Sequence, residues 1–138
     1  MEAQQNKEII RQWVEHWNTR NLQAWIDIVD PNCTFPVLAA SGGTPTLDGY
    51  KQFCMALLDA FPDWNDTIEE IVTEDEVVMM RITERGTHRG AWRTIPATNK
   101  PITITTTGIY HLRDGKIVEL RFYPDRYSLL QQMGLLPS

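Results

Sequence analysis

The spacing of the hydrophobic residues changes at Pro62, and no other feature constrains the fold as strongly. Before Pro62, apolar residues recur every three or four positions, as they do on one face of a helix. Helices are therefore predicted in three segments, at residues 9–17, 22–29 and 50–61. A short strand is predicted at residues 33–37, between the second and the third of these helices.

After Pro62 the apolar residues alternate with polar ones, which is the period of a β-strand. Ile, Val and Thr, which favour strands, are frequent in four segments, at residues 65–72, 77–87, 102–112 and 117–123. A last helix is expected at about residues 126–133, before Gly134. Helices followed by consecutive antiparallel strands predict an α+β fold, with the helices packed on one face of a sheet.

The register of the last hairpin decides which side chains share a face of the sheet. A two-residue turn at Asp114 and Gly115 would mix apolar and polar residues, whereas a three-residue loop at 113–115 separates them. Burial favours separation, so the three-residue loop is predicted. The apolar face then includes Tyr110, Leu112, Val118, Leu120 and Phe122, and the polar face includes His111, Ile117, Glu119, Arg121, Tyr123 and Asp125. The polar face either meets water or lines a cavity closed by the helices.

Length, charge and composition argue against several classes of protein. The 138 residues carry 13 Lys and Arg against 18 Asp and Glu, a net charge of −5, and the length fits one domain over residues 1–138. An acidic chain without a basic cluster argues against nucleic acid as the partner. The uncharged stretch at residues 33–47 is interrupted by Pro36, Gly42 and Gly43, so no membrane-spanning helix is expected. Two cysteines without a CxxC motif, and a polar N-terminus without a signal peptide, predict a cytoplasmic protein.

Several short motifs follow one another along the chain. They are Pro62-Asp63-Trp64, Gly86-Thr87-His88-Arg89-Gly90, Ile95-Pro96-Ala97-Thr98-Asn99-Lys100, Arg113-Asp114-Gly115-Lys116-Ile117-Val118-Glu119, and Asp125 followed by Leu129-Leu130-Gln131-Gln132-Met133-Gly134. In this order they resemble the SnoaL-like polyketide cyclases, also called ester cyclases, of the NTF2-like superfamily. The resemblance covers most of the chain and is strongest from Phe61 to the end.

The resemblance implies a cone-shaped α+β fold. In this fold a curved antiparallel sheet wraps around the N-terminal helices and encloses a pocket. The resemblance also implies a homodimer formed through the outer face of the sheet, a role that the apolar residues from Tyr110 to Phe122 would suit. The polar face would then be the wall of the pocket, and the partner would be a small-molecule substrate.

The resemblance further implies ring closure by an aspartate, without metal or cofactor. The aspartate takes a proton from an activated carbon, the enolate attacks a carbonyl of the same molecule, and the acid returns the proton to the new alkoxide. Asp125 stands at the acid/base position of the family, and His111 stands where a histidine supports that aspartate. Asp125 also precedes the last predicted helix, which it could simply cap, and His111 could be an exposed strand residue.

Six further residues are candidates for substrate binding, namely His88, Arg121, Tyr123, Trp64, Trp92 and Tyr50. His88 belongs to a family motif, although a histidine bonded to a loop backbone fits the same pattern. Trp64 and Trp92 lie outside the predicted helices. They are therefore better candidates for the pocket wall than the tryptophans in the helices, which are expected in the core. Arg121 departs from the family, many members of which carry Trp there. It predicts an anionic group on the substrate, a loss of the ring-closing chemistry, or a structural ion pair.

Three functions remain open at this point. The first is a cofactor-independent cyclase or isomerase acting on an enolisable, largely apolar molecule. The second is a ketosteroid-isomerase-like or epoxide-opening enzyme, and the third is a non-catalytic module that binds a small molecule or a protein. No metal site is expected, because His16, His88 and His111 are far apart in sequence. No cofactor is expected either, because neither a P-loop nor a GxGxxG motif occurs.

Overall fold

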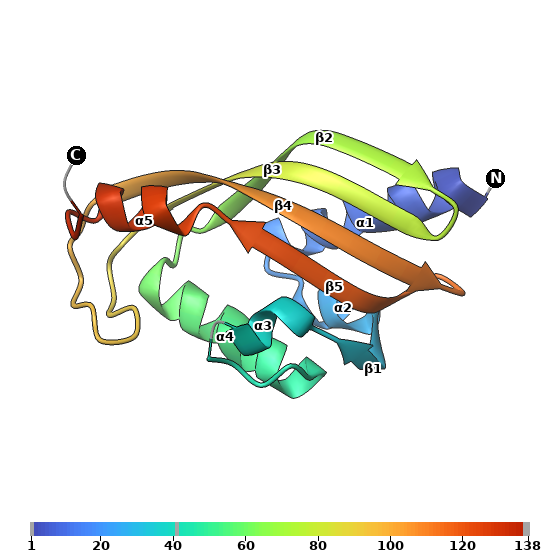
Figure 1. Ribbon diagram of the computed structural model, residues 1–138, viewed down its shortest axis with the longest axis horizontal. Coiled ribbons are helices and arrows are strands. Elements are labelled where there is room, and N and C mark those ends of the chain that lie inside the picture. Colours follow the sequence, from blue (N-terminus) through green and yellow to red (C-terminus); the bar gives the residue numbers. More distant parts are fainter. Residues whose placement is uncertain (1, 41, 137–138) are drawn as a thin grey trace.

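The computed structural model describes residues 2–40 and 42–136. The elements within them are α1 (Glu2–Asn18), α2 (Leu22–Asp27), β1 (Val29–Thr34), α3 (Pro36–Ala40), α4 (Leu47–Ala60), β2 (Asn65–Glu74), β3 (Val77–Thr87), β4 (Pro101–Arg113), β5 (Lys116–Pro124) and α5 (Arg126–Gln132). The sheet has the strand order β1-β5-β4-β3-β2, with β1 parallel to β5 and the other neighbours antiparallel. Figure 1 shows a curved sheet with α2, α3 and α4 beneath it. The predicted α+β fold is confirmed.

The first strand begins earlier than the sequence predicts. The second helix ends at Asp27 instead of Val29, and β1 contains Pro31. A proline can be accommodated because β1 is an edge strand of the sheet, where not every N–H has to donate. The predicted strand at 33–37 is cut short by α3, which begins at Pro36, a residue suited to the first position of a helix.

The turn of the last hairpin differs from the prediction. Asp114 and Gly115 have φ angles of 51° and 77°, and Arg113 pairs with Lys116 across them. Two successive residues with positive φ form the two-residue turn that matches the twist of a hairpin. The predicted three-residue loop is therefore wrong.

A bulge in β5 nevertheless separates apolar from polar side chains. Leu112 pairs with Ile117, but the next pair is His111 with Glu119, so Val118 is an extra residue in β5. Beyond the bulge the side chains alternate as predicted. Ile117 itself is fully buried, so its predicted place on the polar face is wrong.

The helices cover the apolar face of the sheet. Tyr110 and Leu120 are 4% and 1% exposed, and the ring of Tyr110 lies 5.4 Å from that of Trp13 in α1. The apolar face therefore forms the core and cannot be the outer, dimer-forming surface that was expected. A homodimer itself stays a prediction.

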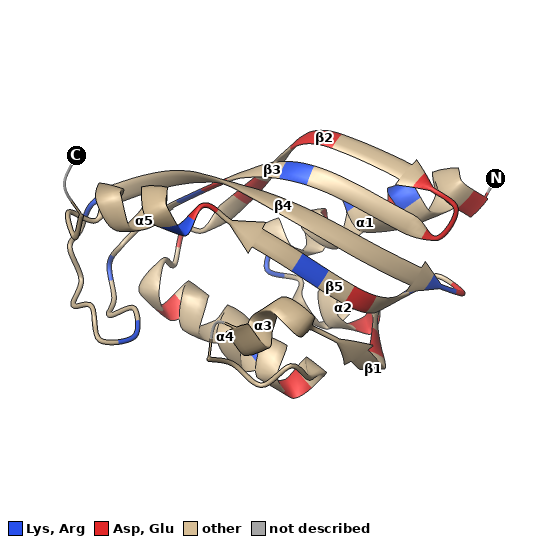
Figure 2. Ribbon diagram, in the orientation of Figure 1, with Lys and Arg blue, Asp and Glu red and all other residues tan. Residues whose placement is uncertain are grey.

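Charged residues of both signs are scattered over the elements in Figure 2, without a block of one sign. This distribution agrees with a chain that carries 13 basic and 18 acidic residues. In the described part of the chain, no helix has the length and apolar character needed to cross a membrane.

Candidate active site

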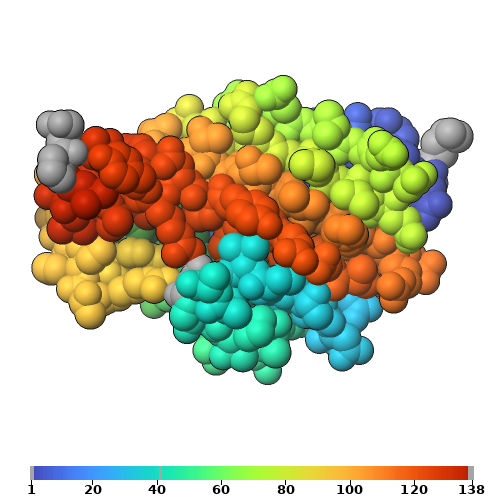
Figure 3. Space-filling model, in the orientation of Figure 1, coloured from blue at the N-terminus to red at the C-terminus, as the bar shows by residue number. Residues whose placement is uncertain are grey.

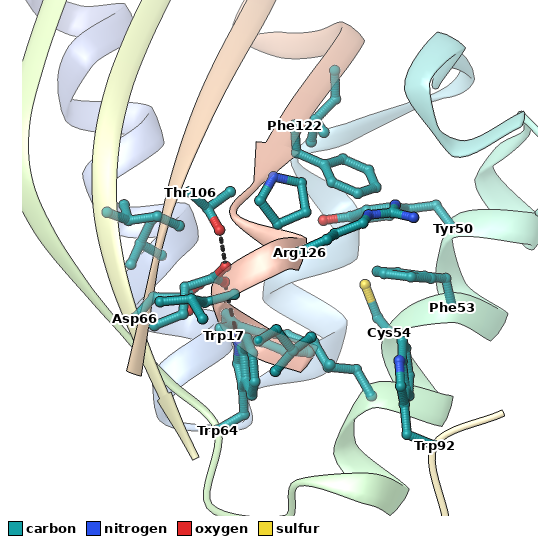
Figure 4. A pocket seen from close by; sticks show the side chains of 18 of the residues that line it. Trp17, Tyr50, Phe53, Cys54, Trp64, Asp66, Trp92, Thr106, Phe122 and Arg126 are labelled. Carbon is teal, nitrogen blue, oxygen red and sulfur yellow. Dashed lines mark hydrogen bonds between the residues drawn. The ribbon is translucent and has the colours of Figure 1, made fainter. Parts of the chain in front are cut away.

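A pocket lies between the apolar face of the sheet and the helices. Its volume is about 280 Å³, and side chains from α1, α4, β2, β3, β4, β5 and α5 line it together with the turn at residues 92–95. Figure 4 shows side chains from these separate elements converging on it. The pocket is thus enclosed by the face of the sheet opposite to the one predicted.

Aromatic rings form much of the pocket wall. Tyr50 of α4 lies 5.8 Å from Trp25 and 6.2 Å from Phe122 of β5, measured between ring centroids. Phe53, one helical turn further along α4, lies 5.8 Å from Trp92. Flat rings at these separations provide a large apolar surface with little conformational freedom to lose, so the wall suits a flat, largely apolar molecule.

Two carboxyl groups interrupt this apolar lining. Asp66 of β2 and Glu84 of β3 are directly opposite each other in the sheet, and both side chains line the pocket. The Trp64 indole N–H donates to Glu84 Oε2 at 3.1 Å, and the Thr106 hydroxyl donates to Glu84 Oε1. Figure 4 marks these bonds beside the Asp66 side chain. The two carboxyl groups with their two donors form what we call the acid pair.

The surroundings of Asp66 favour its neutral form. Burial raises the pKa of Asp66 well above its ordinary value of 3.8, and the charge of Glu84 and a side-chain hydrogen bond to it raise the pKa further. The positive charge of Arg20 acts in the opposite direction and does not cancel the shift. Asp66 Oδ1 is buried and has no hydrogen-bond partner among the described residues. These surroundings thus favour the protonated form of Asp66 beside a second carboxyl group.

The backbone of Asp66 is fixed by the end of α1. The Asn18 side chain donates to the Asp66 carbonyl at 2.7 Å and accepts from the Asp66 N–H at 2.9 Å. Arg20 donates to the carbonyls of Trp64 and Pro62, at 2.6 and 3.1 Å. These bonds hold the first residues of β2 against α1, which aims the Asp66 side chain into the pocket.

The tyrosine and cysteine side chains in the pocket are neutral donors. Burial raises the pKa values of Tyr50 and Tyr110 well above 10, and it also raises the pKa of the Cys54 thiol. Outside the pocket, burial raises the pKa of Cys33 to about 12, so neither thiol is a ready nucleophile. Among residues 2–40 and 42–136, no three His, Cys, Asp or Glu side chains are grouped to hold a metal ion.

Three of the predicted binding residues line the pocket. They are Tyr50, Trp64 and Trp92. Tyr50 and Trp64 are 8% and 3% exposed, and Trp92 is partly buried. The structure thus brings together the aromatic part of the predicted site, whereas their contact with substrate stays a prediction.

Three other predicted residues lie on the outer face of the sheet. His111 Nε2 is 3.5 Å and Arg121 Nη2 is 3.3 Å from the carboxylate of Glu119, in side chains that are 43% and 40% exposed. Tyr123 is 47% exposed on the same face. The expectation that this polar face lines the pocket is wrong, because the helices need the apolar face to bury their own hydrophobic residues.

Asp125 is exposed and lies at the start of α5. Its side chain accepts a hydrogen bond from the Ser128 N–H at 3.0 Å, which is the bond of a helix cap. Pro124 and Arg126 on either side line the pocket, but Asp125 is not among the lining residues. The expected pairing of Asp125 with His111 inside one cavity is therefore wrong, and a catalytic role for Asp125 stays a prediction.

His88 is buried outside the pocket lining. Its Nδ1 lies 2.9 Å from the Thr98 hydroxyl, and its ring stacks on Phe61 at 5.1 Å. Its backbone N–H and C=O bond to Lys100 and Asn99. Burial lowers the pKa of His88, so the ring is neutral at pH 7. These contacts anchor the loop at residues 89–100, and the expectation that His88 lies in the pocket is wrong.

The sequence reasoning missed Asp66, Glu84 and Thr106. A signal for two of them was present in the strand patterns. Val78, Met80 and Ile82 form an apolar alternation that Glu84 interrupts, and Thr106 interrupts a similar alternation in β4. A polar side chain at an inward position needs a partner or a function, so such interruptions point to a site.

A family model and several solved structures match the chain. The model of the SnoaL-like polyketide cyclase family matches residues 7–133. The structure of AclR from Streptomyces galilaeus, a proposed hydroxylase, has a TM-score of 0.86 at 23% identity and covers 98% of this chain and 99% of that chain. IdmH from Streptomyces antibioticus, a proposed polyketide cyclase, has a TM-score of 0.81 at 24% identity, with coverages of 94% and 98%. No curated protein matches the chain.

The two kinds of comparison carry different weight. At these identities, the likeness to solved structures shows a shared SnoaL-like, NTF2-like fold. The family match is independent of that likeness and extends over most of the chain. The chain therefore belongs to the SnoaL-like polyketide cyclase family.

Proposed function

We propose that the chain is a cofactor-independent cyclase or isomerase that moves protons with the acid pair, Asp66 and Glu84. The pair carries the proposal because it lies in a pocket whose other lining is mainly apolar and aromatic. Membership of the SnoaL-like polyketide cyclase family supports a cyclase or isomerase role. The apolar lining favours a substrate that is enolisable and largely apolar.

The two members of the acid pair have different surroundings, which supports different roles. The raised pKa of Asp66 favours its protonated form, which can donate to an oxygen that gains negative charge. Glu84 accepts hydrogen bonds from Trp64 and Thr106, and an ionised carboxylate keeps lone pairs for a further proton. The pair thus offers one acid and one base, separated only by the spacing of two strands.

Each proton and electron pair can be followed through the proposed reaction. Glu84 takes a proton from a carbon next to a carbonyl group, and the electrons of that C–H bond form an enolate. The enolate carbon attacks a second carbonyl carbon of the same molecule, which makes the C–C bond and leaves an alkoxide. Asp66 gives its proton to the alkoxide, and the proton on Glu84 then passes to Asp66 and restores the pair. Isomerisation uses the same transfers without the C–C bond.

The pocket wall supports this chemistry in two ways. Rings such as Trp25, Tyr50 and Phe53 can hold a flexible substrate folded, which brings its two reacting carbons together. The same rings exclude water, and this strengthens the electrostatic effect of the acid pair.

The experiment uses 2-tetralone, a flat apolar ketone whose C1 protons are acidic. Binding is first measured by calorimetry, and exchange of the C1 protons in deuterated buffer is then followed by NMR. Asp66→Asn and Glu84→Gln are expected to slow the enzyme-catalysed exchange by about 100-fold or more. Asp125→Asn is the matched control and is expected to leave exchange within about twofold of the parent.

Two results would overturn the proposal. Exchange that persists in Asp66→Asn and Glu84→Gln but is lost in Asp125→Asn would make Asp125 the acid/base. Tight binding of 2-tetralone by a parent protein that does not accelerate exchange would favour a non-catalytic binding module.

A further inference from the structure

Two arginines line the pocket in addition to the acid pair. Among the described lining residues, the charged ones are Asp66, Glu84, Arg93 and Arg126. The two arginines come from the turn at residues 92–95 and from the start of α5, whereas the acid pair lies in β2 and β3. We infer that Arg93 and Arg126, which line the pocket and are exposed to solvent, bind an anionic group of the substrate, a carboxylate. The inference rests on the proposed function, which assigns the proton transfers to the acid pair.

Arg93 is presented by a tight turn. Trp92 and Ile95 exchange two backbone hydrogen bonds, both of 2.9 Å, so Arg93 and Thr94 form a two-residue turn. Arg93 has a φ angle of 56°, a left-handed conformation that costs a non-glycine residue about 1 kcal/mol. Its guanidinium carbon lies 5.6 Å from the centre of the Trp92 ring, and Trp92 and Ile95 line the pocket with it. The turn therefore fixes a positive charge beside the pocket wall.

Arg126 lies in α5 and lines the same pocket. It is the first residue of that helix, directly after the capping residue Asp125. A positive side chain is unfavourable near the N-terminal end of a helix, where the N–H groups already carry partial positive charge. Stability of α5 therefore does not explain an arginine here. Figure 4 shows the Arg126 side chain among those that surround the pocket.

The two arginines come from segments that meet at one end of the molecule. Figure 3 shows the yellow loop that contains Arg93 against the red atoms of α5, and Figure 1 places both segments at the same end of the sheet. Burial lowers the pKa of Arg126, and the nearby positive charge of Arg93 lowers it further. Two guanidinium groups that repel each other are stabilised by an anion between them, and their planar N–H groups match a carboxylate.

This arrangement would fix the orientation of the substrate in the pocket. A carboxylate held by Arg93 and Arg126 is kept away from the acid pair, where the charge of Glu84 would repel it. The apolar body then lies along the aromatic wall and presents its carbonyl groups to the acid pair. The substrate class is therefore a flat, apolar, enolisable molecule that carries one anionic group at the end remote from the reacting carbons.

The test compares two probes of the same shape, 2-naphthoate and neutral 2-naphthamide, by calorimetry. The parent is expected to bind 2-naphthoate about tenfold or more tightly than 2-naphthamide, the effect of one charge-assisted hydrogen bond. Arg93→Gln and Arg126→Gln are each expected to weaken 2-naphthoate binding about tenfold and to leave 2-naphthamide binding unchanged. Arg113→Gln, in the β4–β5 turn, is the matched control and is expected to change neither affinity.

Equal affinity of the parent for the two probes, or 2-naphthoate binding that survives both pocket substitutions, would overturn the inference. Added salt provides a second measurement, because it should weaken 2-naphthoate binding in the parent and not in the double variant. The neutral ketone 2-tetralone carries no anionic group, so its proton exchange in the parent tests the proposed function without the anion site. Loss of exchange in the parent would therefore refute the proposed function, while the probe comparison separately decides the anion site.

Discussion

Asp66 and Glu84 face each other directly across strands β2 and β3, with both carboxyl groups inside the pocket. Two ionised carboxylates at opposite positions would destabilise a sheet. The raised pKa of Asp66 reduces this repulsion, because it favours the neutral form of that carboxyl group. The raised pKa of Asp66 therefore lets two carboxyl groups lie side by side in the sheet.

The first prediction concerns stability as a function of pH. The folded chain keeps a proton on Asp66 that the unfolded chain loses near pH 3.8, so this residue makes stability fall as the pH rises from about 4 through the raised pKa. Asp66→Asn should lack this fall. Its free energy of unfolding should therefore rise relative to that of the parent, by up to about 1.4 kcal/mol for each pH unit. Urea denaturation between pH 4 and pH 8 measures the difference. Asp59→Asn, at an exposed position of α4, is the control, and its stability should depend on pH in the same way as that of the parent.

The second prediction concerns the donor from β4. Thr106→Val keeps the shape of the side chain but removes the hydroxyl that bonds to Glu84. Exchange of 2-tetralone should slow about tenfold, while the affinity for 2-tetralone stays within about twofold. Thr105→Val, one residue earlier and exposed on the outer face, is the control. An equal effect of the two substitutions would refute the orienting role of Thr106.

The third prediction concerns the attachment of β2 to α1. Asn18→Ala removes both hydrogen bonds to the backbone of Asp66, and the free energy of unfolding should fall by about 1–3 kcal/mol. The orientation of the Asp66 carboxyl group should also become less restricted. Exchange of 2-tetralone should therefore slow more than its binding weakens. Asn32→Ala, at an exposed position of β1, should alter neither quantity. Exchange at the parental rate in Asn18→Ala would show that the acid pair needs no such support.

The fourth prediction separates a helix cap from a catalyst at Asp125. Asp125→Ala removes the acceptor of the Ser128 N–H and should cost about 1 kcal/mol, whereas Asp125→Asn can still cap the helix and should cost little. Both variants should keep the exchange activity. Thermal denaturation and NMR exchange, run on the same samples, distinguish the cap from an acid/base, for which both variants would lose activity.

The fold could be predicted from the sequence because local patterns determine it. The change of period at Pro62 and the alternation in β3 and β4 require helices on one face of an antiparallel sheet. The turn at Asp114 and Gly115 was not predicted correctly, because a bulge at Val118 produces the same separation of faces as a longer loop. Alternation reveals which residues share a face, but not which irregularity of the backbone achieves it.

The site was predicted less well, for a physical reason. His111 and Arg121 stand out as a polar face, and a pocket was assigned to that face. An apolar pocket instead belongs to the hydrophobic face, where two carboxyl groups interrupt an otherwise ordinary core pattern. The pairing of Asp66 with Glu84 also depends on the register of β2 on β3, which contains a bulge after Ile68. Sequence spacing alone does not give that register.

The titration of the Asp66 carboxyl group is the most direct test of the account. In ¹³C-labelled protein, the carboxyl resonance that disappears in Asp66→Asn identifies the residue, and its chemical shift is followed with pH. The account predicts a midpoint well above 3.8, and a midpoint that moves down in Glu84→Gln because the neighbouring charge is gone. A midpoint near 3.8 that does not respond to Glu84→Gln would contradict it.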